Sequence, residues 1–226
     1  MKETILSYKE EGLAVAIALE PIAVESRGEP GPIPEKLKDT FLEDLNEFLP
    51  NILEILEETK VEIFSPMNEQ DYKLGIDTAS EWGQSVLPII KETFSGKILW
   101  KGSLFEHVSR NRNIEIDFSG YDIVGFSAFP FSGINRYPSE INDFIETISE
   151  WANEDGVNQI FISEFGSYEP VPISPNDEPR AIEIVFEESD SRVDGFFVFD
   201  PPRGFGTAIK GSILEDVVKE EFSEFE

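Results

Sequence analysis

The stretch Gln159-Ile160-Phe161-Ile162-Ser163-Glu164-Phe165-Gly166 carries the pattern on which the fold prediction rests. A short apolar run of this kind, bounded by polar residues and glycine, indicates a strand buried in a parallel sheet. A glutamate follows the run directly. Five further short apolar or β-branched runs recur along the chain, at residues 13–18, 61–65, 97–100, 122–126 and 195–199.

Segments with helical periodicity separate these six runs. Apolar residues recur at three- and four-residue steps over residues 37–56, 82–93, 141–151, 181–186 and 213–222, and a shorter helix is predicted over 3–11. Pro50 predicts a kink or break in the helix over 37–56. Because strands alternate with helices, the sequence predicts an α/β chain with a parallel sheet and outer helices.

Composition narrows the possible functions. The chain has 226 residues, with 18 Lys and Arg against 46 Asp and Glu and a net charge of -28. This charge repels phosphate backbones and anionic lipids, so neither a nucleic-acid nor a membrane partner is expected. With no cysteine and one histidine, His107, the chain excludes disulfides, thiol nucleophiles and zinc sites built on Cys and His. Carboxylates are the acid/base groups left to consider.

Two strand ends carry a glutamate. Glu69 follows the run that ends at Ser65, and Glu164 follows the run over 159–163. In a parallel barrel the carboxyl ends of the strands carry the chemistry, and strands three apart in order face each other across the mouth. Carboxyl groups about 5–5.5 Å apart act as nucleophile and acid/base in retaining glycoside hydrolysis. Solvated surface glutamates are the alternative interpretation in so acidic a chain.

Asn68-Glu69 and Glu164-Phe165-Gly166 resemble the motifs of the retaining (β/α)8 glycoside hydrolases of the large clan of cellulases, mannanases and β-galactosidases. Segments 94–100, 121–125 and 210–212 are similar to the family 113 β-mannanases or a cellulase-like neighbour. The resemblance implies that Glu69 is the acid/base closing strand 4 and Glu164 the nucleophile closing strand 7. It implies a β-linked neutral polysaccharide, β-mannan or β-glucan, as substrate, and an extracellular or cell-surface location, although this chain carries no signal peptide. The chemistry requires no cofactor or metal.

Six residues are candidate substrate contacts: Asn68, Trp100, Phe129, Phe199, Glu20 and Arg203. Asn68 directly precedes the expected acid/base and is placed to hydrogen-bond a sugar hydroxyl. Aromatic residues at strand ends stack on sugar faces, but a core aromatic explains Trp100 equally well. Salt bridges within loops are the alternative for Glu20 and Arg203. His107 lies in a charged stretch and is expected at the surface.

The sequence departs from the clan at two positions. Clan members often place a tyrosine after strand 6 that hydrogen-bonds the nucleophile, and Phe129 stands there in this chain. They usually end strand 8 with a tryptophan, and Phe199 stands there. Both departures favour an alternative function, a non-catalytic carbohydrate-binding or scaffold protein, whereas the retained pair of glutamates favours a hydrolase.

Numbered by the resemblance, the run over 13–18 is strand 3 and the run over 195–199 is strand 8. The prediction is one TIM-barrel domain over residues 1–226, with strands 3 to 8 and without its first two βα units. The length agrees with this, because complete barrels typically have about 250 residues. Three explanations account for the two missing units: a longer natural chain, a partner that fills the gap, or a reduced barrel closed by local rearrangement. We favour the first, because clan members also take sugar-binding side chains from strands 1 and 2. Open sheet edges at strands 3 and 8 also predict self-association.

Overall fold

The computed structural model describes residues 1–20, 31–103, 116–166, 173–200 and 207–224. Its strands are hydrogen-bonded in chain order: β1 (Ala16–Ala18), β2 (Ile63–Ser65), β3 (Lys97–Gly102), β4 (Ile123–Ser127), β5 (Ile160–Gly166) and β6 (Gly195–Phe199). The pairings β1–β2, β2–β3 and β5–β6 are parallel. Every strand overlaps the apolar run that predicted it, so the predicted α/β fold class is confirmed.

Seven helices are described along the chain: α1 (Lys2–Glu10), α2 (Lys38–Glu58), α3 (Gln70–Leu74), α4 (Ile76–Thr93), α6 (Tyr137–Glu154), α7 (Glu178–Ser189) and α8 (Ile213–Glu224). Two single 3-10 turns accompany them, η2 (Glu35–Leu37) and η3 (Asp190–Arg192). Within the described ranges, no helix is both long and apolar enough to cross a membrane.

Pro50 does not break the helix, because α2 runs continuously from Lys38 to Glu58. A kink at Pro50 stays a prediction. Proline removes one intrahelical hydrogen bond and crowds the preceding turn. On both sides of it, however, α2 buries Leu49, Leu53 and Leu56 completely. Burial of that apolar face stabilises the helix by more than the proline destabilises it.

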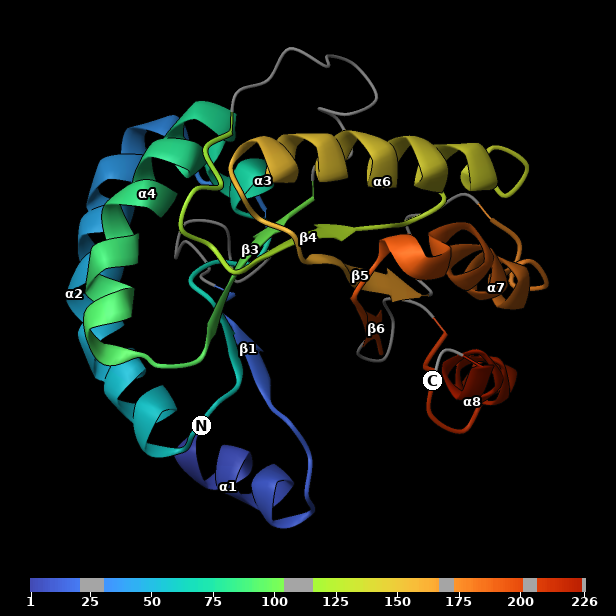
Figure 1. Cartoon of the computed structure of the whole chain (residues 1–226), viewed down its shortest axis with the longest axis horizontal. Helices are drawn as coiled ribbons and strands as arrows, with labels where there is room; N and C mark the ends of the chain where they lie inside the picture. Colours follow the sequence, from blue (N-terminus) through green and yellow to red (C-terminus); the bar gives the residue numbers. More distant parts are fainter. Residues whose placement is uncertain (21–30, 104–115, 167–172, 201–206, 225–226) are drawn as a thin grey trace. The chain divides into compact units, whose positions relative to one another are not determined.

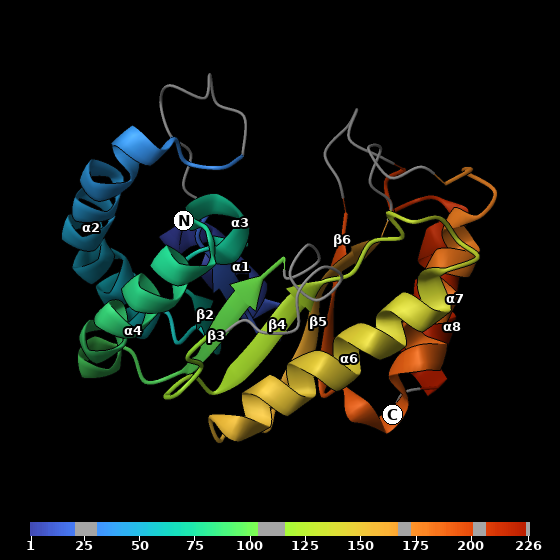
Figure 2. The same cartoon turned by 90° about the horizontal axis from the view of Figure 1, so that it is seen from above.

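The chain divides into two compact units. Of the described residues, the first unit holds 1–20, 31–103, 116–124 and 151–158, and therefore β1, β2 and β3. Its helices α2 and α4 pack side by side, as Figure 1 and Figure 2 both show. Phe64 on β2 and Trp100 on β3 are fully buried in the core of this unit.

Strand β1 stands at one end of the strand order. It borders an apolar cavity of about 430 Å³ that residues of α1, of β1 and of the segment between them line. Tyr8 and Leu13, at the rim of this cavity, are about half exposed. Self-association through the open sheet edge stays a prediction.

Of the described residues, the second unit holds 125–150, 159–166, 173–200 and 207–224, and therefore β5 and β6. Helices α7 and α8 pack against each other in it. An aromatic cluster joins the strands to these helices: the ring of Phe186 on α7 lies 5.6 Å from Phe165 on β5 and 5.2 Å from Phe222 on α8, both edge to face. Such edge-to-face pairs add to the stabilisation that burial of the rings already gives.

Candidate functional site

Glu69 lies at the end of a short loop that leaves β2. The strand ends at Ser65, whose hydroxyl donates a hydrogen bond to the Met67 carbonyl at 3.0 Å. The loop is tied to the segment after β1, because Asn68 N–H donates to the Leu19 carbonyl at 2.7 Å. Glu69 then caps α3 with φ 47° and ψ 50°. A residue other than glycine adopts this left-handed region only at an energetic cost, and such strain concentrates at functional sites.

Asn68 and Glu20 lie together beside Glu69. The amide Nδ2 of Asn68 donates to the Glu20 carboxylate at 2.5 Å. The other carboxylate oxygen of Glu20 accepts from the ammonium of Lys73, whose side chain is 1% exposed. Oδ1 of Asn68 is buried and has no hydrogen-bond partner among the described residues. A role of Asn68 or Glu20 in binding substrate stays a prediction.

Sequence reasoning missed Lys73. Its ammonium lies in the interior beside the candidate site, although lysine is almost never fully buried unless it is paired. The one signal in the sequence is the spacing, since Lys73 stands four residues after Glu69, one turn along a helix. That spacing does not reveal the partner, which lies far away along the chain.

Trp100 on β3 is fully buried and packs edge to face against Phe118, with ring centroids 5.0 Å apart. A sugar platform requires an exposed ring face, so this burial favours the alternative interpretation, a core aromatic. Contact of Trp100 with a sugar stays a prediction that its environment does not support.

Three buried polar groups gather near Gly83 on α4. A Cβ at Gly83 would lie 2.7 Å from Tyr121 Oη, 3.5 Å from Gln70 Oε1 and 3.8 Å from Trp100 Nε1. None of these three atoms has a hydrogen-bond partner within the described part of the chain. Burial raises the pKa of Tyr121, so its hydroxyl stays neutral in the physiological range. Gln70, one of the three groups, is the first residue of α3 and directly follows Glu69.

Glu164 lies on β5 where the pairing with β6 is irregular. Ile162 pairs with Phe196 and Phe165 pairs with Val198, so β5 has one residue more than β6 between these pairs. This irregularity is a β-bulge, a feature that re-aims side chains and is common next to active sites. The side chain of Glu164 is partly exposed.

Phe129 and Phe199 lie together in the second unit, at the ends of β4 and β6. Their ring centroids are 6.1 Å apart with an interplanar angle of 89°. Phe131 extends the pair, 6.1 Å from Phe129. The preceding residue, Ala128, donates its N–H to the Glu164 carbonyl at 2.7 Å, which ties this aromatic group to the strand that carries Glu164. Phe129 is only 4% exposed, so little of its ring surface is open to a sugar. A sugar contact through Phe129 stays a prediction.

Arg203 and His107, two further residues singled out in the sequence, lie outside the described residues. Across the described ranges, no group of three or more His, Cys, Asp or Glu side chains is arranged to hold a metal ion. The structure thus brings together Glu20, Asn68 and Glu69 in the first unit, and it brings the backbone of Glu164 together with Phe129 and Phe199 in the second.

The (β/α)8 class combines strands in chain order, helices between them and catalytic residues at the carboxyl ends of strands. This chain has the same features, with glutamates at those ends.

No protein-family model matches this sequence, and no curated protein matches it. Solved structures do match. The family 113 β-mannanase of Alicyclobacillus acidocaldarius in complex with ManMIm aligns with a TM-score of 0.68 and 17% identity over 100% of this chain and 79% of that chain.

Two more matches come from Thermotoga. The hyperthermostable endo-1,4-β-D-mannanase of Thermotoga petrophila RKU-1 aligns with a TM-score of 0.70 and 14% identity, over 98% of this chain and 78% of that one. Cel5A of Thermotoga maritima, in complex with cellobiose, aligns with a TM-score of 0.65 and 19% identity, over 97% and 76%. At such low identity the likeness establishes the fold. It confirms the predicted TIM-barrel type of fold, which this chain shares with these mannanases and with Cel5A.

Proposed function

We propose that this chain is a retaining glycoside hydrolase that cleaves a β-linked neutral polysaccharide, β-mannan or β-glucan. One observation carries the proposal: two glutamates stand near carboxyl ends of strands, each on irregular backbone. Glu69 lies beyond the carboxyl end of β2 and is in the left-handed region. Glu164 lies near the carboxyl end of β5, at a β-bulge. Irregular backbone of this kind persists at sites where side-chain direction matters. The similarity in fold to mannanases and a cellulase supports the substrate class.

Double displacement assigns a different task to each carboxyl group. In the first step the Glu164 carboxylate attacks the anomeric carbon while Glu69 gives its proton to the leaving oxygen, so one glycosidic bond breaks and one ester bond forms. In the second step Glu69 takes a proton from water, the resulting hydroxide attacks the anomeric carbon, and Glu164 leaves as a carboxylate. Both steps invert the anomeric centre, so the configuration is retained overall.

The first test measures release of reducing sugar from β-mannan and β-glucan, with an α-glucan as control substrate. Glu164→Ala is expected to abolish turnover, and Glu69→Gln to lower kcat by about 10²–10⁴-fold, the usual contribution of general acid/base catalysis. Glu54→Gln on α2 and Glu146→Ala on α6, both exposed, are matched controls that should keep wild-type rates. Near-normal hydrolysis by the Glu164 variant would refute the assignment.

A second test separates the two roles. With an aryl β-glycoside that has a good leaving group, azide fills the space of a missing carboxylate. Glu164→Ala plus azide should give the α-glycosyl azide by a single inversion, and Glu69→Ala plus azide the β-glycosyl azide by two. The opposite pairing of products would exchange the roles of the two residues.

The second candidate function is a non-catalytic carbohydrate-binding or scaffold protein. It is favoured by Phe129 and Phe199, which pack on each other in this chain. The resemblance implies that they stand where clan members often have Tyr and usually have Trp. Titration with manno- and cello-oligosaccharides tests it. Binding without sugar release by the wild-type chain would select this alternative, and binding together with release would reject it.

A further inference from the structure

A connected polar network reaches from the end of β1 to α3. The Glu20 carboxylate accepts one hydrogen bond from Asn68 Nδ2 at 2.5 Å and another from the Lys73 ammonium. Both of its oxygens are therefore engaged within the protein. The backbone supports this arrangement, since Asn68 N–H donates to the carbonyl of Leu19, the residue before Glu20, at 2.7 Å.

Lys73 extends the network to the backbone of Glu69. Its side chain is 1% exposed, whereas that of Glu20 is 37% exposed, so the ion pair is buried at its lysine end. A buried ammonium without a counter-charge is strongly unfavourable, and Glu20 supplies that charge. The backbone N–H of Lys73 also donates to the Glu69 carbonyl at 3.0 Å, which is the first i→i−4 hydrogen bond of α3. One residue thus joins the Glu20 carboxylate to the peptide that carries Glu69.

Helix α3 depends on such contacts because it has five residues. A helix this short is not stable by itself. Its other anchor is Asp71, which is 2% exposed and whose carboxylate accepts from Ser103 N–H at 2.7 Å and from the Ser103 hydroxyl at 3.1 Å. Hydrogen bonds to charged groups, which are among the strongest in proteins, therefore hold α3 on two sides. Glu69 directly precedes the helix that these bonds hold.

We propose that Glu20 and Lys73 are positioning residues whose ion pair fixes the Asn68 amide and the Glu69 backbone, and that Glu20 does not contact substrate. This inference rests on the proposed role of Glu69 as acid/base. It replaces the expectation from the sequence that Glu20 binds sugar. Loss of a group that holds the acid/base in place lowers kcat, whereas loss of uniform substrate binding raises KM.

The kinetic test compares Glu20→Gln, Asn68→Ala and the double variant on a β-linked manno-oligosaccharide. We expect Glu20→Gln to lower kcat 10- to 100-fold with KM within threefold of wild type. The factor by which kcat falls in the double variant should be smaller than the product of the factors in the two single variants. Glu58→Gln is the matched control, because it removes an exposed carboxylate paired with Lys2 and should change neither constant. A tenfold rise in KM with kcat unchanged, no effect at all, or fully multiplicative losses would overturn the proposal.

A thermal unfolding cycle tests the network without reference to activity. Glu20→Gln should lower Tm by several degrees because Lys73 is left unpaired, and adding Lys73→Met should restore most of that loss. The corresponding surface cycle, Glu58→Gln with Lys2→Met, should show no coupling. Absence of recovery in the buried cycle overturns the proposal. If the wild-type chain releases no sugar, the proposed function fails by itself and this cycle alone decides whether the network exists.

Discussion

Glu69 stands on a loop between β2 and α3, whereas Glu164 stands within β5. The loop is held by charged groups, the pair of Glu20 with Lys73 and the hydrogen bonds of Asp71. The strand is held by its backbone pairing with β6 and by packed aromatic rings. Where the backbone leaves regular pairing, oriented charge-assisted bonds take the place of the sheet ladder. The first region should therefore respond to loss of charge, and the second to changes of volume and backbone.

The largest effect is expected at Gly166, the last residue of β5. Its φ is 142°, and a Cβ there would lie 2.7 Å from the Phe199 carbonyl oxygen. Gly166→Ala should therefore lower the free energy of unfolding by roughly 3 kcal/mol, from backbone strain together with a clash. Gly133→Ala is the matched control, since φ is 87° but no atom lies within 4 Å of the added Cβ; it should cost roughly 1 kcal/mol. Equal losses in urea unfolding would contradict the clash.

The next effect compares two buried tyrosines, one in each unit. Tyr137 Oη donates to the Ala128 carbonyl at 2.8 Å, while Tyr121 Oη has no partner in the described part of the chain. Tyr137→Phe should cost about 1–3 kcal/mol because it leaves a buried carbonyl unpaired, and Tyr121→Phe should stay within about 0.5 kcal/mol. Chemical denaturation of both variants measures the difference. A large loss at Tyr121 would indicate a bound water that joins it to Gln70 and Trp100.

A smaller effect compares the two glutamates directly. Asparagine tolerates the left-handed backbone of Glu69 but is unfavourable in a strand. Glu164→Asn should therefore be less stable than Glu69→Asn by about 1 kcal/mol, while both variants should lack activity. Tm values of the two variants measure this, with Glu69→Ala and Glu164→Ala to report loss of the side chain alone. The reverse order would show that the contacts of Glu69 outweigh its backbone strain.

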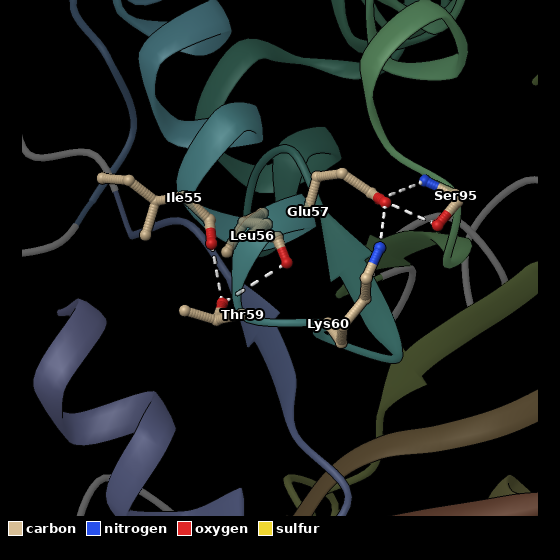
Figure 3. A network of polar contacts seen from close by, with 6 residues as sticks. All are labelled: Ile55, Leu56, Glu57, Thr59, Lys60 and Ser95. Carbon is tan, nitrogen blue, oxygen red and sulfur yellow. Dashed lines mark hydrogen bonds and ion pairs between the residues drawn. The ribbon is translucent and has the colours of Figure 1, made fainter.

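The smallest effect concerns an exposed polar network at the end of α2, drawn in Figure 3. Glu57 accepts from Lys60 at 2.5 Å and from the N–H and hydroxyl of Ser95 at 2.9 and 2.8 Å. The hydrogen bond from Lys60, followed by those from Ser95, lowers the pKa of Glu57 to about 2.

Because folding lowers this pKa, the carboxylate stabilises the folded state above pH 4.5 and loses that effect as the pH falls towards 2. The Tm of wild type should therefore fall slightly more between pH 6 and pH 3 than the Tm of Glu57→Gln. The difference should be small because the group is exposed and screened by solvent. Identical pH profiles of Tm would show that Glu57 does not contribute to the loss of stability of this unit at low pH.

Much of the fold could be predicted because its signals are local. Runs such as Ile160-Phe161-Ile162 and stripes such as residues 141–151 follow from side-chain periods of two and 3.6 residues, which neighbours along the chain determine. The glutamates after two strands could be found in the same way. The break that Pro50 suggested is absent, because the burial of Leu49 and Leu53 beside it depends on tertiary packing.

The sequence by itself determined the alternation of strands and helices, the acidic charge and the position of Glu69 and Glu164 after strands. Only the tertiary structure decided that Lys73 is buried against Glu20, that Trp100 packs on Phe118, and that β5 gains a bulge at Glu164. Each of these features needs a partner from a distant part of the chain. Local periodicity records which face of an element is apolar, but it does not record which residue that face meets.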